Sequence, residues 1–163
     1  MILVTVGTNR APYEGLFEAM DEYALKTGEE VLIQRSMSDF RAKHCRDFGF
    51  VSDEEMRELY DRTDILVCHA GIGTIVNGLE RNIPLVLVPR GVVTSAGADD
   101  QQTVVARKVA QMGRGVVVED LNDLYVKIDE ARSLKMEPYV KDTGLLDYID
   151  RRLTELSEGR RKR

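Results

Sequence analysis

Short, continuously apolar runs alternate along this chain with segments of helical spacing, and this alternation restricts the fold more than any other feature. Runs of this length without polar alternation are typical of strands that are buried on both faces of a parallel sheet. Strands that alternate with helices imply a doubly wound α/β sheet, with right-handed crossovers and helices on both faces. The runs are ILVTVG at 2–7, VLIQ at 31–34, DILVCH at 64–69, PLVLVP at 84–89 and GVVVE at 115–119, and a looser strand is expected within CRDFGFV at 45–51.

The helices between these strands are indicated by their apolar spacing and by signals at their ends. Pro12 fits the first turn of a helix that Gly28 ends. Ser52 and Glu55 form a capping-box pattern at the start of a second helix. One face of the first helix carries Leu16, Phe17, Met20, Tyr23 and Ala24. Further helices are expected at about 74–81, 100–112, 122–134 and 144–156, with Gly113 as a C-cap and a loop from Arg90 up to the 100–112 helix.

Length and composition indicate one folded domain. A chain of 163 residues has room for one ordinary domain with a substantial core. We therefore expect residues 1–163 to form a single domain, in which 144–163 is a C-terminal helix followed by a basic tail. The apolar fraction of 43% is that of a folded protein, and the net charge of −5 gives no reason to expect a nucleic acid as the main partner. The basic tail RRKR either is solvated or contacts an anionic lipid surface.

Targeting signals and metal-site patterns are not found. No apolar run approaches the roughly 20 residues that span a membrane, and the opening MILVTVGTNR has no charged region before its apolar stretch. The two cysteines, Cys45 and Cys68, form neither a disulfide framework nor a CxxC motif, so a reducing cytoplasm is expected. His44 and His69 are the only histidines, and we expect no metal site.

The turn HAGIGT, which follows the strand at 64–69, is the first candidate for a binding site. It contains His69, Gly71, Gly73 and Thr74. In doubly wound sheets ligands bind beyond the carboxyl ends of the strands, where Gly7 also lies. A glycine turn that opens a helix offers backbone N–H groups and a positive helix end to an anion. The alternative is a structural turn in which His69 caps a carbonyl group, and spacing alone leaves both interpretations open.

Two well-known phosphate-binding motifs are excluded. The dinucleotide fingerprint GxGxxG would need a glycine at the position of Val76. The P-loop pattern GxxxxGK[ST] does not occur anywhere in the chain.

The region 64–106 contains a longer pattern: His-x-Gly-x-x-Thr, a short helix, a proline, an apolar strand that ends in proline, a loop, and a glutamine with an alanine four residues later. The matching residues are His69, Gly71, Thr74, Pro84, Pro89, Gln102 and Ala106. This pattern resembles the donor-nucleotide half of GT-B glycosyltransferases, specifically the family 28 C-terminal domain. The opening VTVGT resembles the first strand of stand-alone family members. The resemblance covers nearly the whole chain and implies a Rossmann-like sheet, the C-terminal, donor-binding half of a GT-B fold.

The stand-alone members that this chain resembles are soluble subunits of two-part enzymes. They include the subunit that extends dolichol-linked N-acetylglucosamine, and small subunits of bacterial exopolysaccharide glycosyltransferases, some of them glucuronosyltransferases. The resemblance implies a UDP-sugar donor, no cofactor, a lipid-linked sugar acceptor, and a membrane-anchored partner subunit that binds the acceptor. It also implies a location at the cytoplasmic face of the membrane through that partner. Self-association in isolation is a further expectation.

The resemblance also assigns roles to individual residues. No convincing catalytic base is found in this chain, and the partner is expected to supply it. For His69 a buried structural histidine, for Arg90 a surface arginine and for Asp100 a helix N-cap remain alternatives. The expected diphosphate contacts are His69, Gly71, Gly73, Thr74 and Arg90, the donor-sugar contacts are Asp100, Gln101 and Gln102, and the residues of the cleft loop are Gly7 and Thr8.

Two positions depart from the wider pattern. A glutamate that binds the ribose hydroxyls is replaced by Asn77, and Glu80, one turn further on, is a substitute for it. The glycine two residues before Pro84 is replaced by Asn82, which tolerates the left-handed conformation of a helix end.

The function that these residues predict is that of a donor-binding subunit of a split, inverting glycosyltransferase. A non-catalytic nucleotide- or anion-binding regulatory module is the main alternative, and a nucleotide-sugar epimerase is a weaker one, since it needs a second domain. The transferred sugar is left open. Glucuronate would account for Arg90, and N-acetylglucosamine would fit the other relatives.

Overall fold

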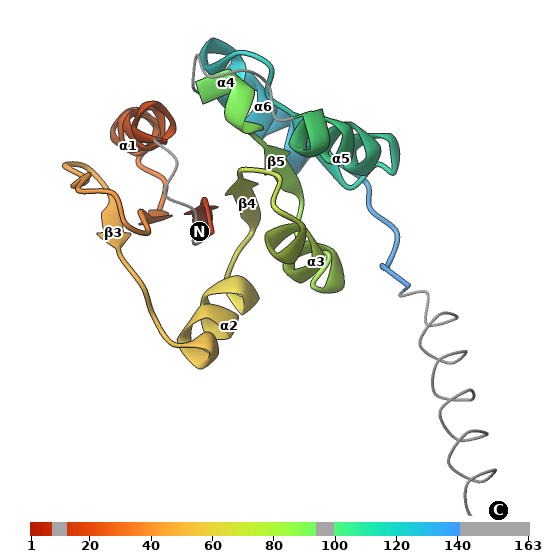
Figure 1. Ribbon diagram of the computed structural model, residues 1–163, viewed down its shortest axis with the longest axis horizontal. Helices are drawn as coiled ribbons and strands as arrows, with labels where there is room; N and C mark the ends of the chain where they lie inside the picture. Colours follow the sequence, from red (N-terminus) through yellow and green to blue (C-terminus); the bar gives the residue numbers. More distant parts are fainter. Residues whose placement is uncertain (8–12, 94–99, 141–163) are drawn as a thin grey trace, which may run out of the picture.

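Six parallel strands form one sheet in the order β3-β2-β1-β4-β5-β6 (Figure 1). The computed structural model describes residues 1–7, 13–93 and 100–140, without the side chains of residues 93 and 100. The strands are β1 (Ile2–Thr5), β2 (Val31–Gln34), β3 (Arg46–Phe48), β4 (Ile65–Cys68), β5 (Leu85–Leu87) and β6 (Gly115–Val117). The helices are α1 (Glu14–Thr27), α2 (Asp53–Asp61), α3 (Ile72–Glu80), α4 (Arg90–Val93), α5 (Asp100–Gln111), the 3-10 turn η1 (Leu121–Asp123) and α6 (Leu124–Arg132).

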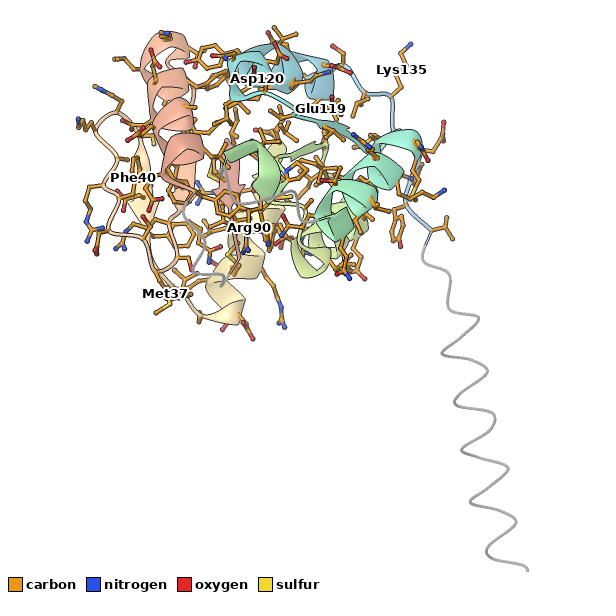
Figure 2. The ribbon with its side chains drawn as sticks, turned by 45° about the horizontal axis from the view of Figure 1, so that its top comes forward. Met37, Phe40, Arg90, Glu119, Asp120 and Lys135 are labelled. Carbon is orange, nitrogen blue, oxygen red and sulfur yellow. The ribbon has the colours of Figure 1, made fainter. Side chains whose placement is uncertain are left out.

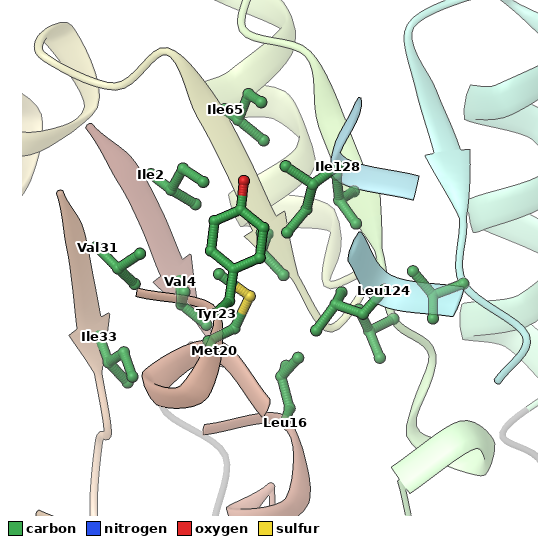
Figure 3. Packing of buried hydrophobic residues seen from close by; sticks show 14 of the residues in the cluster. Ile2, Val4, Leu16, Met20, Tyr23, Val31, Ile33, Ile65, Leu124 and Ile128 are labelled. Carbon is green, nitrogen blue, oxygen red and sulfur yellow. The ribbon is translucent and has the colours of Figure 1, made fainter. Parts of the chain in front are cut away.

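The two faces of the sheet are covered by different helices, which confirms the predicted doubly wound architecture. Successive side chains of a strand point to opposite faces, so Ile2 and Val4 belong to one apolar cluster and Leu3 to the other. Helices α1 and α6 cover the first face, as Figure 3 shows for the side chains around Tyr23. Helices α2, α3 and α5 cover the second face. Both faces of every central strand are therefore buried, which accounts for apolar runs without alternation.

Most predicted helix ends are found where the sequence placed them. The capping box of Ser52 and Glu55 is present at the start of α2, and Gly28 is the left-handed C-cap of α1. Asn82 has a φ of 52° after α3, so it replaces a glycine there as expected. Its side-chain oxygen also accepts hydrogen bonds from Arg114 and from the backbone N–H of Tyr139. The predicted helix at 144–156 lies outside the described residues.

Three boundaries differ from the predictions. The loop expected after Arg90 begins with the short helix α4, although the sequence RGVV has weak helix propensity. The turn closes because the backbone N–H of Val92 donates to the carbonyl of Pro89, and the side chain of Val92 packs against the core. The helix expected from residue 122 begins as the 3-10 turn η1, and α3 begins two residues before Thr74.

A buried carboxylate attaches the segment between β2 and β3 to α1. Asp21 of α1 is 6% exposed, and its Oδ1 accepts hydrogen bonds from the backbone N–H groups of Lys43, His44 and Cys45. Burial raises the pKa of Asp21, but the hydrogen bonds outweigh it, and the pKa lies below the ordinary value of 3.8. Burial and the neighbouring Asp21 raise the pKa of the Cys45 thiol to about 12.

None of the helices in the described part of the chain has the length and apolar character that crossing a bilayer requires.

Asp21→Ala is expected to lower the free energy of unfolding by about 2 to 3 kcal/mol, because three backbone donors lose a charged acceptor. Since the pKa of Asp21 is lowered on folding, its stabilisation is present above its unfolded value and is lost as the pH falls through the folded one. Urea titrations between pH 7 and pH 3 measure both effects. The control is Glu22→Gln, which changes an exposed ion pair of the same helix. An equal loss in the two variants would contradict the assignment.

Candidate functional site

The candidate site lies where the order of the strands reverses. From β1 the chain continues to β2 and β3 on one side, and β4 then pairs with the other side of β1. The register places Thr5 opposite Cys68, so Gly7 and His69 leave the sheet at the same carboxyl edge. The crevice at such a reversal is the usual ligand site of doubly wound sheets. The two segments singled out in the sequence are therefore brought together by the topology.

The imidazole of His69 fits between two glycines and a tyrosine. A Cβ atom on Gly71 would lie 2.4 Å from Nε2 of His69, and one on Gly7 would lie 3.1 Å from Cε1. On another side Tyr13 meets the imidazole edge-on, with the ring centroids 6.1 Å apart and the planes at 72°. A side chain at residue 71 would thus occupy the place of the ring. The need for glycine at residue 71 comes from His69 and not from turn geometry, because the φ of Gly71 is −71°.

The turn after β1 is held by a hydroxyl group. Gly7 has a φ of 65°, which favours glycine, and its N–H donates to Oγ1 of Thr5 over 3.2 Å. The hydroxyl of Thr5 in turn donates to the side-chain oxygen of Gln34 in β2. The predicted cleft residue Thr8 lies outside the described residues.

Helix α3 begins without a side-chain cap. Gly71 is its N-cap and, as a glycine, has no side chain that could accept a hydrogen bond from the N–H groups of the first turn. These N–H groups and the helix dipole favour an anion. A Cβ atom on Gly73 would meet nothing within 4 Å, so the surface above this turn is open. The preceding Ala70 has a φ of 63°, a strained conformation for a residue with a side chain.

Electrostatics make His69 a neutral hydrogen-bonding group. It is 8% exposed. Burial lowers the pKa of its imidazole, the backbone of Thr5 raises that pKa, and the charge of Arg90 lowers it again, with a net result below the ordinary 6.5. The buried Nδ1 atom makes no hydrogen bond of good geometry in the described part of the chain. At neutral pH the ring is therefore uncharged, with one N–H donor and one acceptor nitrogen.

Arg90 connects the end of β5 to the start of α5. Its backbone N–H donates to Oε1 of Gln102 over 2.9 Å, which fixes the orientation of that amide. In the view of Figure 2 Arg90 lies between α1 and α5, over the edge where the strands end. A cleft of about 550 Å³ opens between the first turns of α3 and α5. It is lined by Ala70, Gly71, Ile72, Gln101, Gln102, Val104 and Val105.

This geometry agrees with the comparison of the sequence with protein families. The model of the glycosyltransferase family 28 C-terminal domain matches residues 1–144. The chain belongs to this family. It is therefore a glycosyltransferase domain, with the Rossmann-like fold of the C-terminal half of GT-B enzymes. No curated protein matches the sequence.

Three solved structures that are similar to this family 28 domain belong to larger proteins. The glycotransferase of kitacinnamycin is 20% identical with a TM-score of 0.65, over 81% of this chain and 34% of that one. The UDP-GlcNAc 2-epimerase of Methanocaldococcus jannaschii, solved with UDP-GlcNAc and UDP, is 12% identical with a TM-score of 0.64, over 94% of this chain and 45% of that one. Os79 from O. sativa, solved with UDP, is 18% identical with a TM-score of 0.61, over 81% and 31%. The domain thus spans less than half the length of these proteins.

The remaining candidate residues occupy different surroundings. Thr74 is 9% exposed, and its hydroxyl interacts with the hydroxyl of Tyr60. Burial raises the pKa of Tyr60 above its ordinary value, and the interaction with Thr74 offsets part of that rise. The amide of Asn77 donates to the carbonyl of Gly73 and accepts from Arg81, so it is engaged within α3. Neither it nor Glu80, which is exposed at the end of α3, lines the 550 Å³ cleft. Asp100 is the first described residue of α5, and its side chain is not described.

Three features of the site were not predicted from the sequence. Tyr13 contacts His69 from 56 positions away, and no local signal marks that contact. The cleft beside Gly71 has apolar walls of Ile72 and Val104, which spacing alone assigns to ordinary helix surfaces. A second cleft of about 610 Å³ lies along β6 between α5 and α6, and no candidate site residue lines it.

Alanine at Gly71 and at Gly73 is expected to have opposite effects on stability. Gly71→Ala places a methyl group against the buried ring of His69 and should cost about 1 to 3 kcal/mol. Gly73→Ala meets open space in a helix and should stabilise the protein by about 0.5 to 1 kcal/mol. Denaturant titrations without ligand compare the two variants directly. Equal changes of the same sign would show that His69 does not fix residue 71.

Proposed function

We propose that this domain binds a UDP-sugar at the carboxyl ends of β1 and β4 and is the donor-binding part of a split, inverting glycosyltransferase. The observation that carries this proposal is the uncapped N-terminus of α3 beside the buried imidazole of His69. Backbone N–H groups, a neutral imidazole and the nearby charge of Arg90 together suit a diphosphate. The open surface at Gly73 leaves room for its oxygens.

The chemistry that this arrangement supports is stabilisation of a leaving diphosphate. A hydroxyl oxygen of the acceptor attacks the anomeric carbon, and the bond from that carbon to UDP breaks with its electron pair on the diphosphate. Donors that are already fixed around the diphosphate stabilise the charge that develops there. Burial of His69 and the hydrogen bond that Gln102 accepts from the backbone N–H of Arg90 reduce the reorganisation that this requires.

The proton of the attacking hydroxyl must go to a base, and no base is found among the described residues that line the cleft. Its described lining consists of apolar side chains, a glycine and the amides of Gln101 and Gln102. We therefore place the base on a membrane-anchored partner subunit that presents a lipid-linked sugar, at the cytoplasmic face of the membrane. In this proposal Gln101, Gln102 and Asp100 contact the donor sugar. Asn77 or Glu80 contacts the ribose. For Asn77 this contact replaces the hydrogen bond that its side-chain oxygen accepts from Arg81.

His69→Ala and Thr74→Ala are each expected to weaken UDP binding about 5- to 150-fold, the range for loss of one hydrogen bond to a charged group. Thr74→Ser, which keeps the hydroxyl, should bind nearly as the natural chain does. Calorimetric titration with UDP measures these affinities. His44→Ala removes the other histidine, which is exposed, and serves as the control. Unchanged affinity in both alanine variants would refute a diphosphate site at this turn.

Sugar transfer is expected to require a second component. The purified chain should transfer little radiolabelled sugar from a UDP-sugar to a polyprenyl-linked acceptor, because the described residues of the cleft lining include no base. Membranes that carry an acceptor-binding subunit should restore transfer, and His69→Ala should reduce it. Full transfer by the chain alone would refute the split enzyme. UDP binding without transfer under any of these conditions would favour a regulatory module.

A further inference from the structure

Helices α3 and α5 present an apolar face to the outside of the molecule. Ile72 and Val76 of α3 are 60% and 38% exposed, and Val104 of α5 and Met112 just after it are 66% and 49% exposed. We call this surface the α3–α5 face. Core residues of both helices pack against the same side of the sheet. Ile72 and Val104 also line one cleft, which shows that the two apolar surfaces adjoin.

The spacing places the exposed apolar residues of each helix on one side of that helix. Ile72 and Val76 are one turn apart on α3, and Val104 and Met112 are two turns apart with Lys108 between them. A long lysine side chain can cover apolar surface with its methylene groups while the ammonium stays in water. Isolated apolar side chains are ordinary on a surface, whereas a contiguous group of this kind marks an interaction site.

The described chain leads to one end of this face. After α6 the backbone crosses to the C-terminal ends of α3 and α5. There the N–H of Tyr139 donates to Oδ1 of Asn82 over 2.8 Å. The ring of Tyr139 lies 5.8 Å from the guanidinium carbon of Arg114. Figure 1 shows this segment passing beside α5. The described residues end with Val140, which is 84% exposed.

The sequence that follows has a matching apolar stripe. Residues 141–163 lie outside the described part of the chain, and their sequence carries Leu146, Ile149, Leu153 and Leu156 at helical spacing. A helix over 144–156 would be roughly 20 Å long, and the 12 residues of α5 span about 18 Å. A helix that starts at the C-terminal ends of α3 and α5 would therefore reach their first turns.

We propose that the segment 144–156 docks on the α3–α5 face of its own chain, antiparallel to both helices. Its leucine and isoleucine side chains would cover Ile72, Val76, Val104 and Met112. This contact is a property of the fold and does not depend on the proposed transfer reaction.

Serine substitutions in the full-length chain test the docking. Val104→Ser should lower the Tm by about 2 to 4 °C, the shift that loss of one buried apolar side chain gives in a protein of this size. Val126→Ser is the matched control, since Val126 of α6 is also a helical valine with 66% exposure and lies on the other face of the sheet. Valine and serine have similar helix propensities, so the control should change the Tm very little.

A double-mutant cycle identifies the occupant. Leu153→Ser should lower the Tm as Val104→Ser does, and the double variant should lose less than the sum of the two, as coupled sites do. These losses should be independent of protein concentration. Three results would overturn the proposal: equal small shifts for Val104→Ser and Val126→Ser, strictly additive losses in the double variant, or losses that change with protein concentration and so indicate a second copy.

Discussion

The packing of His69 between Gly7 and Gly71 is the contact on which the candidate site depends. It joins the end of β1 to the start of α3 at the point where the strand order reverses. The edge of Tyr13 completes the enclosure and ties α1 to the same ring. A neutral, buried imidazole is thereby held beside an uncapped helix N-terminus. The strained backbone of Ala70 lies between the two.

The surroundings of this contact divide into a polar side and an apolar side. Arg90 supplies positive charge near His69, and its backbone orients Gln102 toward the same edge of the sheet. Across the cleft, Ile72 and Val104 form apolar walls that continue down the α3–α5 face. The domain spans less than half the length of similar enzymes. The side of the site that these residues build therefore combines positive charge with an apolar wall.

Much of the fold was determined by the sequence alone. Continuously apolar strands can be buried only between two layers of helices. The alternation of such strands with helices along the chain therefore predicted the doubly wound parallel sheet. Local sequence signals also predicted the capping box of Ser52 and Glu55 and the left-handed backbone conformation of Asn82. The motif from His69 to Gln102 indicated the family, which the match over residues 1–144 confirms. These features depend on residues close together in the chain, where spacing carries the information.

Only the tertiary structure decided how the site is built. The sequence placed Gly71 in a phosphate-binding turn, but the ring of His69 is what excludes a side chain there. Helix α4 forms against propensity because Val92 packs on the core. The contact of Tyr13 with His69 and the bond of Arg90 to Gln102 join residues that are distant in the chain. Such contacts follow from how the strands are ordered and how the helices cross them, which local patterns of apolar residues, turns and caps do not specify.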